Sequence, residues 1–424
     1  MGYFVSAASA RLFIFSIFLV NNFKLSVPLV PLDRSIRSRQ ETSITRESLP
    51  RNILQSKKGN TQKMSDSESA THKALPEKLL VGYTTNSCQD LNDMSKVTRA
   101  VQEGVNVLIW AFIKLVPDEN GTKVRVDGGP NLIHFELYKQ QLVELGHMDV
   151  IHLVSFGGWN GPHLPSGYDG KDLFYAFHNW NTPNGCKLFD GIDWDLEGED
   201  NLQGKNNLFT LECLEQVEKV SQLAKKYGYT VSMAPAESYL DIPNSKFSRY
   251  VNLTYPDDNW HHEFSYHGAS VYAYILAKWG DCIDFISVQF YESFSHAAYD
   301  IKKLGVAPHE FLIAYIQRLF DSLEGEEGYF VNFEQDETCK LKNQFVSVPL
   351  NKLVFGFANG WTNCEDEKAI FFPTNDIKIA YNKLKVLGRA PRGFMFWVIE
   401  EEGNGGLYYT PGLSDILKIR TSDS

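Results

Sequence analysis

The chain has 424 residues, of which 43% are hydrophobic, 13% aromatic and 22% charged, the usage of a globular protein and not of a disordered or collagen-like one. Its net charge of −11, from 41 Lys and Arg against 52 Asp and Glu, argues against a strongly basic nucleic-acid-binding protein. Only one apolar run, near the N-terminus, approaches the ~20 residues of a membrane span, which excludes a protein with several spans.

The N-terminal part differs in charge from the remainder. Residues 1–75 carry 11 basic and 5 acidic side chains, although the whole chain is acidic. Leu12–Val20 is an apolar run that follows Arg11 and has the length of a signal-peptide core. We expect residues 1–30 to be a signal peptide or targeting segment and residues 31–75, rich in Ser, Thr, Arg and Lys, to be a disordered linker or propeptide. Secretion is the leading interpretation, and a membrane anchor or an organelle presequence stays open.

The chain contains six cysteines, whose pairing depends on whether it is secreted. An even number in a secreted chain permits three disulfides, whose pairing the sequence does not decide. No CxxC motif is present, so neither a zinc ribbon nor a thioredoxin-like motif is indicated. The cysteines are Cys88, Cys186, Cys213, Cys282, Cys339 and Cys364.

From residue 78 onward, short apolar runs alternate with stretches of helical period, such as 208–223 and 377–387. Alternation of strands and helices indicates parallel strands joined by right-handed crossovers. Because Gly82-Tyr-Thr-Thr-Asn-Ser is not a dinucleotide-binding loop, we expect a (β/α)₈ barrel over residues 76–424 and not a doubly wound sheet. The eight expected strands are Leu79–Thr84, Val105–Ile113, Val150–Phe156, Phe189–Leu196, Thr230–Ala234, Ile283–Phe290, Leu353–Ala358 and Gly393–Val398.

The fourth of these strands carries three acids at alternate positions. Asp193, Asp195 and Glu197 share one face, which we expect to be the barrel interior, and their apolar neighbours share the other. Acids spaced about 6.5–7 Å apart along a strand raise one another's pKa values. At least one is therefore expected to keep its proton near neutral pH, as a general acid must. Glu197 stands at the carboxyl end, where the active sites of such barrels open.

Two other interpretations of these acids compete. Their spacing imitates a calcium-binding loop, but that loop needs Glu at position 12, where Gly204 stands. A solvated acidic strand face is disfavoured by the large apolar residues that alternate with the acids, such as Ile192 and Trp194.

The segment Asp190–Glu197 matches the DGxDxDxE signature of glycoside hydrolase family 18, the chitinases and endo-β-N-acetylglucosaminidases. Further segments resemble this family in order and spacing and together cover roughly residues 78–400. The overall pattern looks like the compact hevamine-type and bacterial subgroup. These segments are Trp110–Phe112, Ser155–Trp159 (the SxGG strand end), Ser232–Pro235, Gln289–Glu292 and Met395–Trp397.

The resemblance implies a mechanism in which the substrate's own acetamido group is the nucleophile. Glu197 would protonate the glycosidic oxygen and Asp195 would hold the acetamido N–H, while Asp193 would share a proton with Asp195. Tyr291 would hydrogen-bond the acetamido group, and Trp397 would form the floor under the sugar. The remaining substrate-binding residues that the resemblance implies are Tyr83, Phe112, Gly157, Gly158, Met233 and Gln289.

The expected substrate is chitin or an N-acetylglucosamine oligosaccharide, bound by a monomer without metal, cofactor or nucleic acid. An endo-β-N-acetylglucosaminidase acting on N-glycan cores would use the same residues, and a sugar-binding lectin is a third alternative. Departures from the family pattern, namely Glu292 and the acidic run Glu400–Glu402, leave subsite preferences open. The long segment Glu324–Val348 is expected to shape one wall of the cleft.

Overall fold

The computed structural model describes residues 73–201, 203–251, 270–292, 295–321, 326–362 and 370–419. The predicted targeting segment 1–30, nearly all of the predicted linker 31–75 and Cys364 lie outside these residues. No described helix is both long and apolar enough to cross a bilayer.

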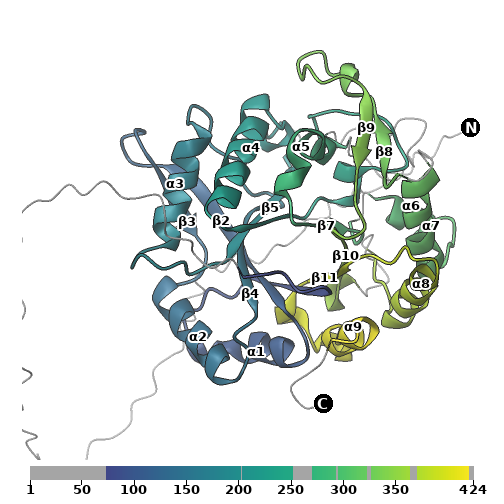
Figure 1. Ribbon diagram of the computed structural model, residues 1–424, viewed down its shortest axis with the longest axis horizontal. Helices are drawn as coiled ribbons and strands as arrows, with labels where there is room; N and C mark the ends of the chain where they lie inside the picture. The colour runs from purple at the N-terminus through teal and green to yellow at the C-terminus, as the bar shows by residue number, and fades with distance from the viewer. Residues whose placement is uncertain are drawn as a thin grey trace, which may run out of the picture. The chain divides into compact units, whose positions relative to one another are not determined.

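Eight parallel strands of the described chain close into a barrel, with helices around it (Figure 1). The order around the barrel is β1-β11-β10-β7-β6-β5-β4-β2, and β2 pairs with β1 to close it. All eight predicted strands are confirmed, as is the (β/α)₈ fold. The strands are β1 (Leu79–Thr84), β2 (Val107–Pro117), β4 (Ile151–Gly158), β5 (Gly191–Leu196), β6 (Thr230–Met233), β7 (Phe285–Gln289), β10 (Leu353–Ala358) and β11 (Gly393–Trp397).

The outer layer of the described chain contains nine α-helices, which pack against the barrel through apolar stripes. In α4, the predicted three-residue spacing buries Leu214, Val217 and Val220, and the helix begins at Leu211 because the Thr210 hydroxyl accepts from Cys213 N. Leu208, which the pattern also included, precedes the helix. The helices are α1 (Ser95–Gln102), α2 (Leu132–Glu144), α3 (Gly170–Asn181), α4 (Leu211–Lys226), α5 (Val271–Trp279), α6 (His296–Lys302), α7 (Pro308–Asp321), α8 (Thr374–Val386) and α9 (Thr410–Leu417).

Strand alternation divides the apolar residues into two buried clusters. Outward-facing strand residues such as Leu80 pack in a large cluster between barrel and helices. Inward-facing residues such as Val81 and Tyr83 form a smaller cluster inside the barrel, which also contains Tyr291. Apolar side chains therefore fill the barrel interior, and polar groups at the carboxyl ends of the strands pack against them.

Two strand pairs depart from the simple alternation. Strand β3 (Val124–Gly128) forms an antiparallel hairpin with the extended β2. The segment Glu324–Val348, expected as a cleft wall, contains the antiparallel hairpin β8 (Gly328–Val331) and β9 (Gln344–Ser347). The chain between these two strands binds the loop after β6, since Arg249 Nε donates to Asp336 Oδ2 over 2.7 Å. The described part of the insertion thus braces that loop.

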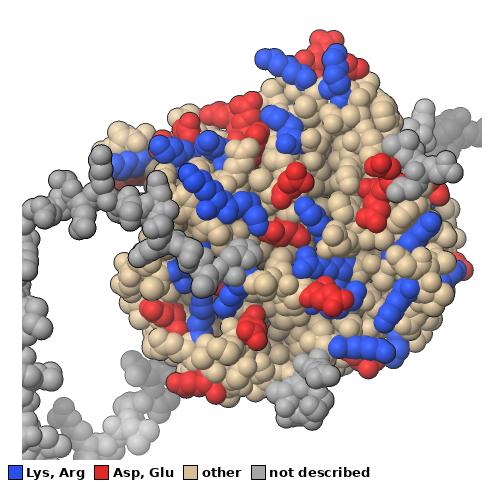
Figure 2. Space-filling view, viewed as in Figure 1, with Lys and Arg blue, Asp and Glu red and all other residues tan. Residues whose placement is uncertain are grey.

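Two further features are the distribution of surface charge and the state of the cysteines. On the face that Figure 2 shows, the Lys and Arg of the described residues are interspersed with Asp and Glu. Within the described residues no disulfide is present, and the five cysteines there are free. None of the disulfides that the even cysteine count permits is therefore formed among the described cysteines.

Candidate active site

The three predicted acids lie along the inner face of β5 and its extension. Asp193, Asp195 and Glu197 are 0%, 3% and 6% exposed, so accessibility grows from the barrel interior toward its carboxyl end. Their neighbours Ile192 and Trp194 face the helices, as the alternation predicted. Because Asp193 and Asp195 are in the strand β5 and not in a loop, the calcium-loop interpretation is not supported. No group of three or more His, Cys, Asp or Glu in the described residues is arranged to hold a metal ion.

Asp193 is held by hydroxyl groups from three different strands. Tyr83 of β1 and Ser155 of β4 donate to Oδ2 over 2.6 and 2.7 Å, and Ser232 of β6 donates to Oδ1 over 2.6 Å. Burial raises the pKa of Asp193, and the three hydroxyl donors work in the opposite direction. Burial and the neighbouring Asp193 charge raise the pKa of Tyr83 well above its usual value, so it remains a hydroxyl donor. Tyr83 thus positions an acid, a use of its hydroxyl that the resemblance did not indicate.

Asp195 and Glu197 form a hydrogen-bonded carboxyl pair. Two carboxyl groups in contact need a proton between them. Burial and then the Asp195 charge raise the pKa of Glu197 well above its usual value, and the hydrogen bond raises it further. The same bond opposes the burial that raises the pKa of Asp195. Both carboxyl groups thus favour their protonated form, and a pair that keeps a proton is what general acid catalysis needs before proton transfer.

Gln289 and Glu292 act on this pair from the end of β7. Gln289 Nε2 donates to Asp195 Oδ1 over 2.8 Å and to Ala234 O over 2.7 Å, which orients the carboxylate. Glu292 follows the strand, and burial raises its pKa to about 7. Its negative charge raises the pKa values of Asp195 and Glu197. The departure from the family pattern at Glu292 is thus an additional acid beside the candidate catalytic pair.

An aromatic group lies at the same end of the barrel. The rings of Trp397 and Phe112 stack with centroids 5.7 Å apart, and the ring of Tyr83, in the strand β1 that lies between β2 and β11, has its centroid 5.5 Å from that of Trp397. Both Trp397 and Phe112 are partly buried against the inner cluster. Tyr291 is buried in that cluster, and its pKa is raised by burial and by Glu292. The structure therefore brings the predicted aromatic residues to one place beside the acids.

The two glycines at the end of β4 are explained by packing. Gly157 has φ +110°, and a Cβ there would lie 2.7 Å from the carbonyl carbon of Asp195 and closer still to its oxygen. A Cβ on Gly158 would meet the Phe112 ring at 2.5 Å. Both positions need glycine so that β4 can approach the acid-bearing strand and the aromatic group.

Two residues of the signature segments lie away from this site. Met233 was expected to bind substrate, but it is fully buried in the cluster between barrel and helices, because strand alternation points it outward. Ser232, its neighbour, points inward instead. Asp190 precedes β5, and its carboxylate accepts from His152 N over 2.8 Å, which is a structural contact.

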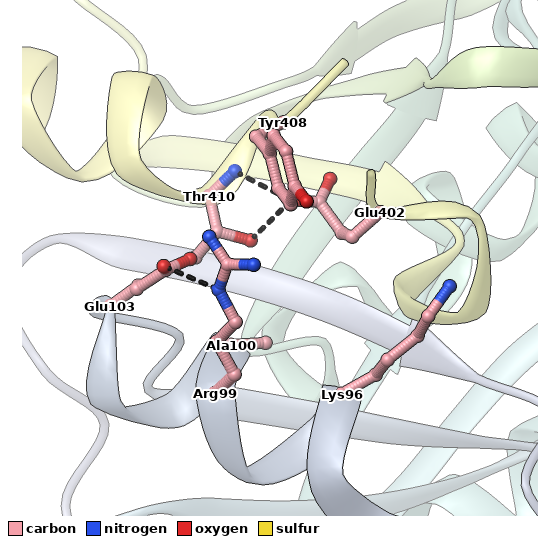
Figure 3. A pocket seen from close by; sticks show the side chains of 7 residues that line it. All are labelled: Lys96, Arg99, Ala100, Glu103, Glu402, Tyr408 and Thr410. Atoms are coloured by element: carbon pink, nitrogen blue, oxygen red, sulfur yellow. Dashed lines mark hydrogen bonds and ion pairs between the residues drawn. The ribbon is translucent and has the colours of Figure 1, made fainter. Parts of the chain in front are cut away.

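The acidic run after β11 is used for local structure. Glu402 is buried and accepts from Thr410 N and Oγ1 and from Tyr409 N, and Figure 3 shows it beside Thr410. Glu400 accepts from Thr84 Oγ1 at the end of β1. The adjoining hollow of about 90 Å³ is lined by Lys96 and Arg99 of α1 together with Glu402 and Thr410. Glu400 and Glu402 are thus both hydrogen-bonded within the fold.

Sequence reasoning missed Ser155 and Ser232 as site residues, although both lie in the segments that carry the resemblance. The signal that could have identified them is the register of their strands with β5. Ser155 and Ser232 pair with Asp193 on the two strands that flank it, so all three side chains must face inward.

No protein-family model matches the chain, and no curated protein sequence matches it. Solved structures to which it is similar include a GH18 chitinase from Pseudoalteromonas aurantia, at 15% identity over 81% of this chain and 100% of that one, with a TM-score of 0.47. A fungal endo-β-N-acetylglucosaminidase of glycosyl hydrolase family 18 shows 15% identity over 82% and 97%, with a TM-score of 0.48. A tamarind chitinase-like lectin shows 16% identity over 81% and 97%, with a TM-score of 0.40. At these identities and TM-scores the similarities decide nothing about activity, and the closed strand pairing establishes the barrel independently.

Proposed function

We propose that this protein hydrolyses β-1,4 linkages between N-acetylglucosamine units of chitin, with the substrate's acetamido group as nucleophile. The observation that carries the proposal is the buried carboxyl pair at the end of β5, in which Asp195 and Glu197 are hydrogen-bonded to each other and Gln289 orients Asp195. The family resemblance of Asp190–Glu197 supports the substrate class.

The residues divide the reaction into two steps. In the first, Glu197 donates its proton to the glycosidic oxygen while the acetamido oxygen attacks the anomeric carbon, which releases the leaving sugar and forms an oxazolinium ion. Asp195, oriented by Gln289, accepts from the acetamido N–H and stabilises the positive charge. In the second step, the Glu197 carboxylate removes a proton from water, which attacks the same carbon, so the configuration is retained.

The surrounding groups support the proton transfer. Glu292 and Asp195 disfavour the ionised form of Glu197, so its proton is kept until a leaving oxygen accepts it. Asp193 interacts with Asp195 through its charge, and its own oxygens are occupied by three hydroxyl donors. In the proposed mechanism Trp397 provides the apolar floor for the sugar and Tyr291 a hydroxyl for the acetamido group.

Cleavage of the N-glycan chitobiose core is the second candidate, because it requires the same carboxyl pair. The deciding experiment is product analysis by mass spectrometry on a chitin hexamer and a high-mannose N-glycan, run side by side. Cleavage of the hexamer, with slow cleavage when the sugar at the scissile bond lacks its N-acetyl group, supports the proposal. Cleavage of the N-glycan alone supports the alternative, and binding without cleavage of either indicates a lectin.

A further inference from the structure

The chain that carries Glu197 lies beyond the regular pairing of β5. The last pair with β4 is Gly158 with Leu196, and the last pair with β6 is Met233 with Trp194. Yet the residues from Leu196 to Gly198 are buried, and buried backbone polar groups need partners. The hydrogen bonds that position this segment must therefore come from elsewhere.

Three side chains provide most of them. The Tyr272 hydroxyl accepts from Leu196 N over 2.8 Å and donates to Leu196 O over 3.0 Å. The Tyr239 hydroxyl accepts from Gly198 N over 2.9 Å. His163 Nε2 lies 2.8 Å from Glu197 O, and since a carbonyl only accepts, this nitrogen carries the proton.

These side chains come from three separate elements. His163 lies in the loop after β4, Tyr239 in the 3₁₀ turn η3 (Glu237–Leu240) after β6, and Tyr272 in the first turn of α5. The two tyrosine rings are buried and nearly parallel, at 4° with centroids 6.1 Å apart. Burial lowers the pKa of His163 to about 4, so its ring is neutral and donates a single proton at neutral pH.

We propose that Tyr272, Tyr239 and His163 are positioning residues that hold the Glu197 carboxyl against Asp195. The proposal rests on the proposed function, because Glu197 must be the acid for its position to matter. Tyr272 binds the backbone of the residue before Glu197, Tyr239 that of the residue after it, and His163 that of Glu197 itself. Together these contacts fix the backbone of Glu197 and so the direction of its Cα–Cβ bond. A misplacement of about 1 Å in a reacting group costs about 100-fold in rate.

The test uses Tyr272→Phe and Tyr239→Phe in the full chain, with turnover of a chitin hexamer measured from pH 4 to 9. Each variant removes one hydroxyl and keeps the ring. We expect kcat to fall at least tenfold with KM within threefold. We also expect the alkaline limb of the pH profile to move to lower pH, because a displaced Glu197 loses the Asp195 contact that raises its pKa.

A matched control separates positioning from stability. Tyr409 is also buried, and its hydroxyl donates to Phe372 O over 2.7 Å. This hydrogen bond does not involve β5. Tyr409→Phe should lower Tm by a similar amount and leave kcat and the pH profile unchanged. For the third residue, His163→Gln keeps a donor and should retain more turnover than His163→Leu.

The proposal is overturned if Tyr272→Phe keeps the wild-type kcat and pH profile, or if Tyr409→Phe loses turnover equally. If the wild-type protein cleaves neither substrate, the proposed function fails on its own. In that case the Glu197 pKa, measured by carboxyl NMR in wild type and Tyr272→Phe, still tests the positioning. An equal pKa in the two proteins then overturns it.

Discussion

Replacement of Glu197 by Gln tests the central assignment with little change in shape. Glutamine fills the same volume, and its amide can donate to Asp195 in place of the carboxyl proton that Glu197 shares with that residue. The substrate-binding groups around it are unchanged. The variant therefore removes proton transfer and preserves the arrangement on which binding depends.

The expected magnitude follows from the two roles of this one side chain. A positioned acid or base contributes about 10²–10⁴-fold to a rate. We expect kcat to fall by about 10³-fold or more, which corresponds to about 4 kcal/mol in the activation free energy.

The stability of the Glu197→Gln variant should increase, although its turnover falls. The folded-state pKa of Glu197 is raised, so above its unfolded-state pKa the protein must take up a proton to fold, and this cost grows with pH. Glutamine has no such cost, and Tm at pH 7 is expected to rise.

The assay measures hexamer turnover by product chromatography, hexamer affinity by calorimetry and Tm by scanning calorimetry. Glu144→Gln, at the exposed end of α2, is the matched control and should behave as wild type in all three. Residual turnover above a tenth of wild type would refute the assignment of Glu197 as the acid. Loss of hexamer affinity in parallel with turnover would refute the inference that the variant keeps the site intact.

Three further predictions concern the groups around the acid. Glu292→Gln removes a charge that raises the pKa of Glu197, so the alkaline limb of kcat/KM should move to lower pH; a shift to higher pH would contradict this electrostatic effect. Gly157→Ala should lower the unfolding free energy by about 3 kcal/mol, because a positive φ and backbone crowding both oppose a Cβ there. Gly167→Ala, at a positive φ in open space, should cost only about 1 kcal/mol in the same denaturant titration, and equal losses would exclude crowding as the cause. Tyr83→Phe should cost about 2 kcal/mol by removing a 2.6 Å hydrogen bond to a buried acid, and unchanged stability would show that this bond contributes nothing.

Local pattern was sufficient to predict the barrel and the facing of its acids. Short apolar runs and helical periods come from the side-chain repeat of each element, and the sequence shows that repeat directly. The same alternation put Asp193, Asp195 and Glu197 on one face, where the structure has them. It also contained the correction for Met233, since its inward-facing neighbour Ser232 bonds Asp193.

Contacts between distant segments were not predictable in this way. The Tyr83 hydroxyl reaches Asp193 across 110 positions, and Tyr272 reaches Leu196 across 76. Neither residue stands at a spacing from β5 that indicates the contact. The hairpin of β8 and β9 likewise pairs within itself, but only the structure shows that it braces the loop at Arg249.

The amino-acid order alone determined which elements form, how they alternate and which side of β5 is acidic, because these depend on the repeat of residues close together in the chain. The tertiary structure decided how strongly the environment favours the protonated form of these acids. Protonation depends on burial and on the charges and donors around each carboxyl, and strands far apart in the sequence supply these: Tyr83 from β1, Gln289 from β7 and Glu292 beyond it.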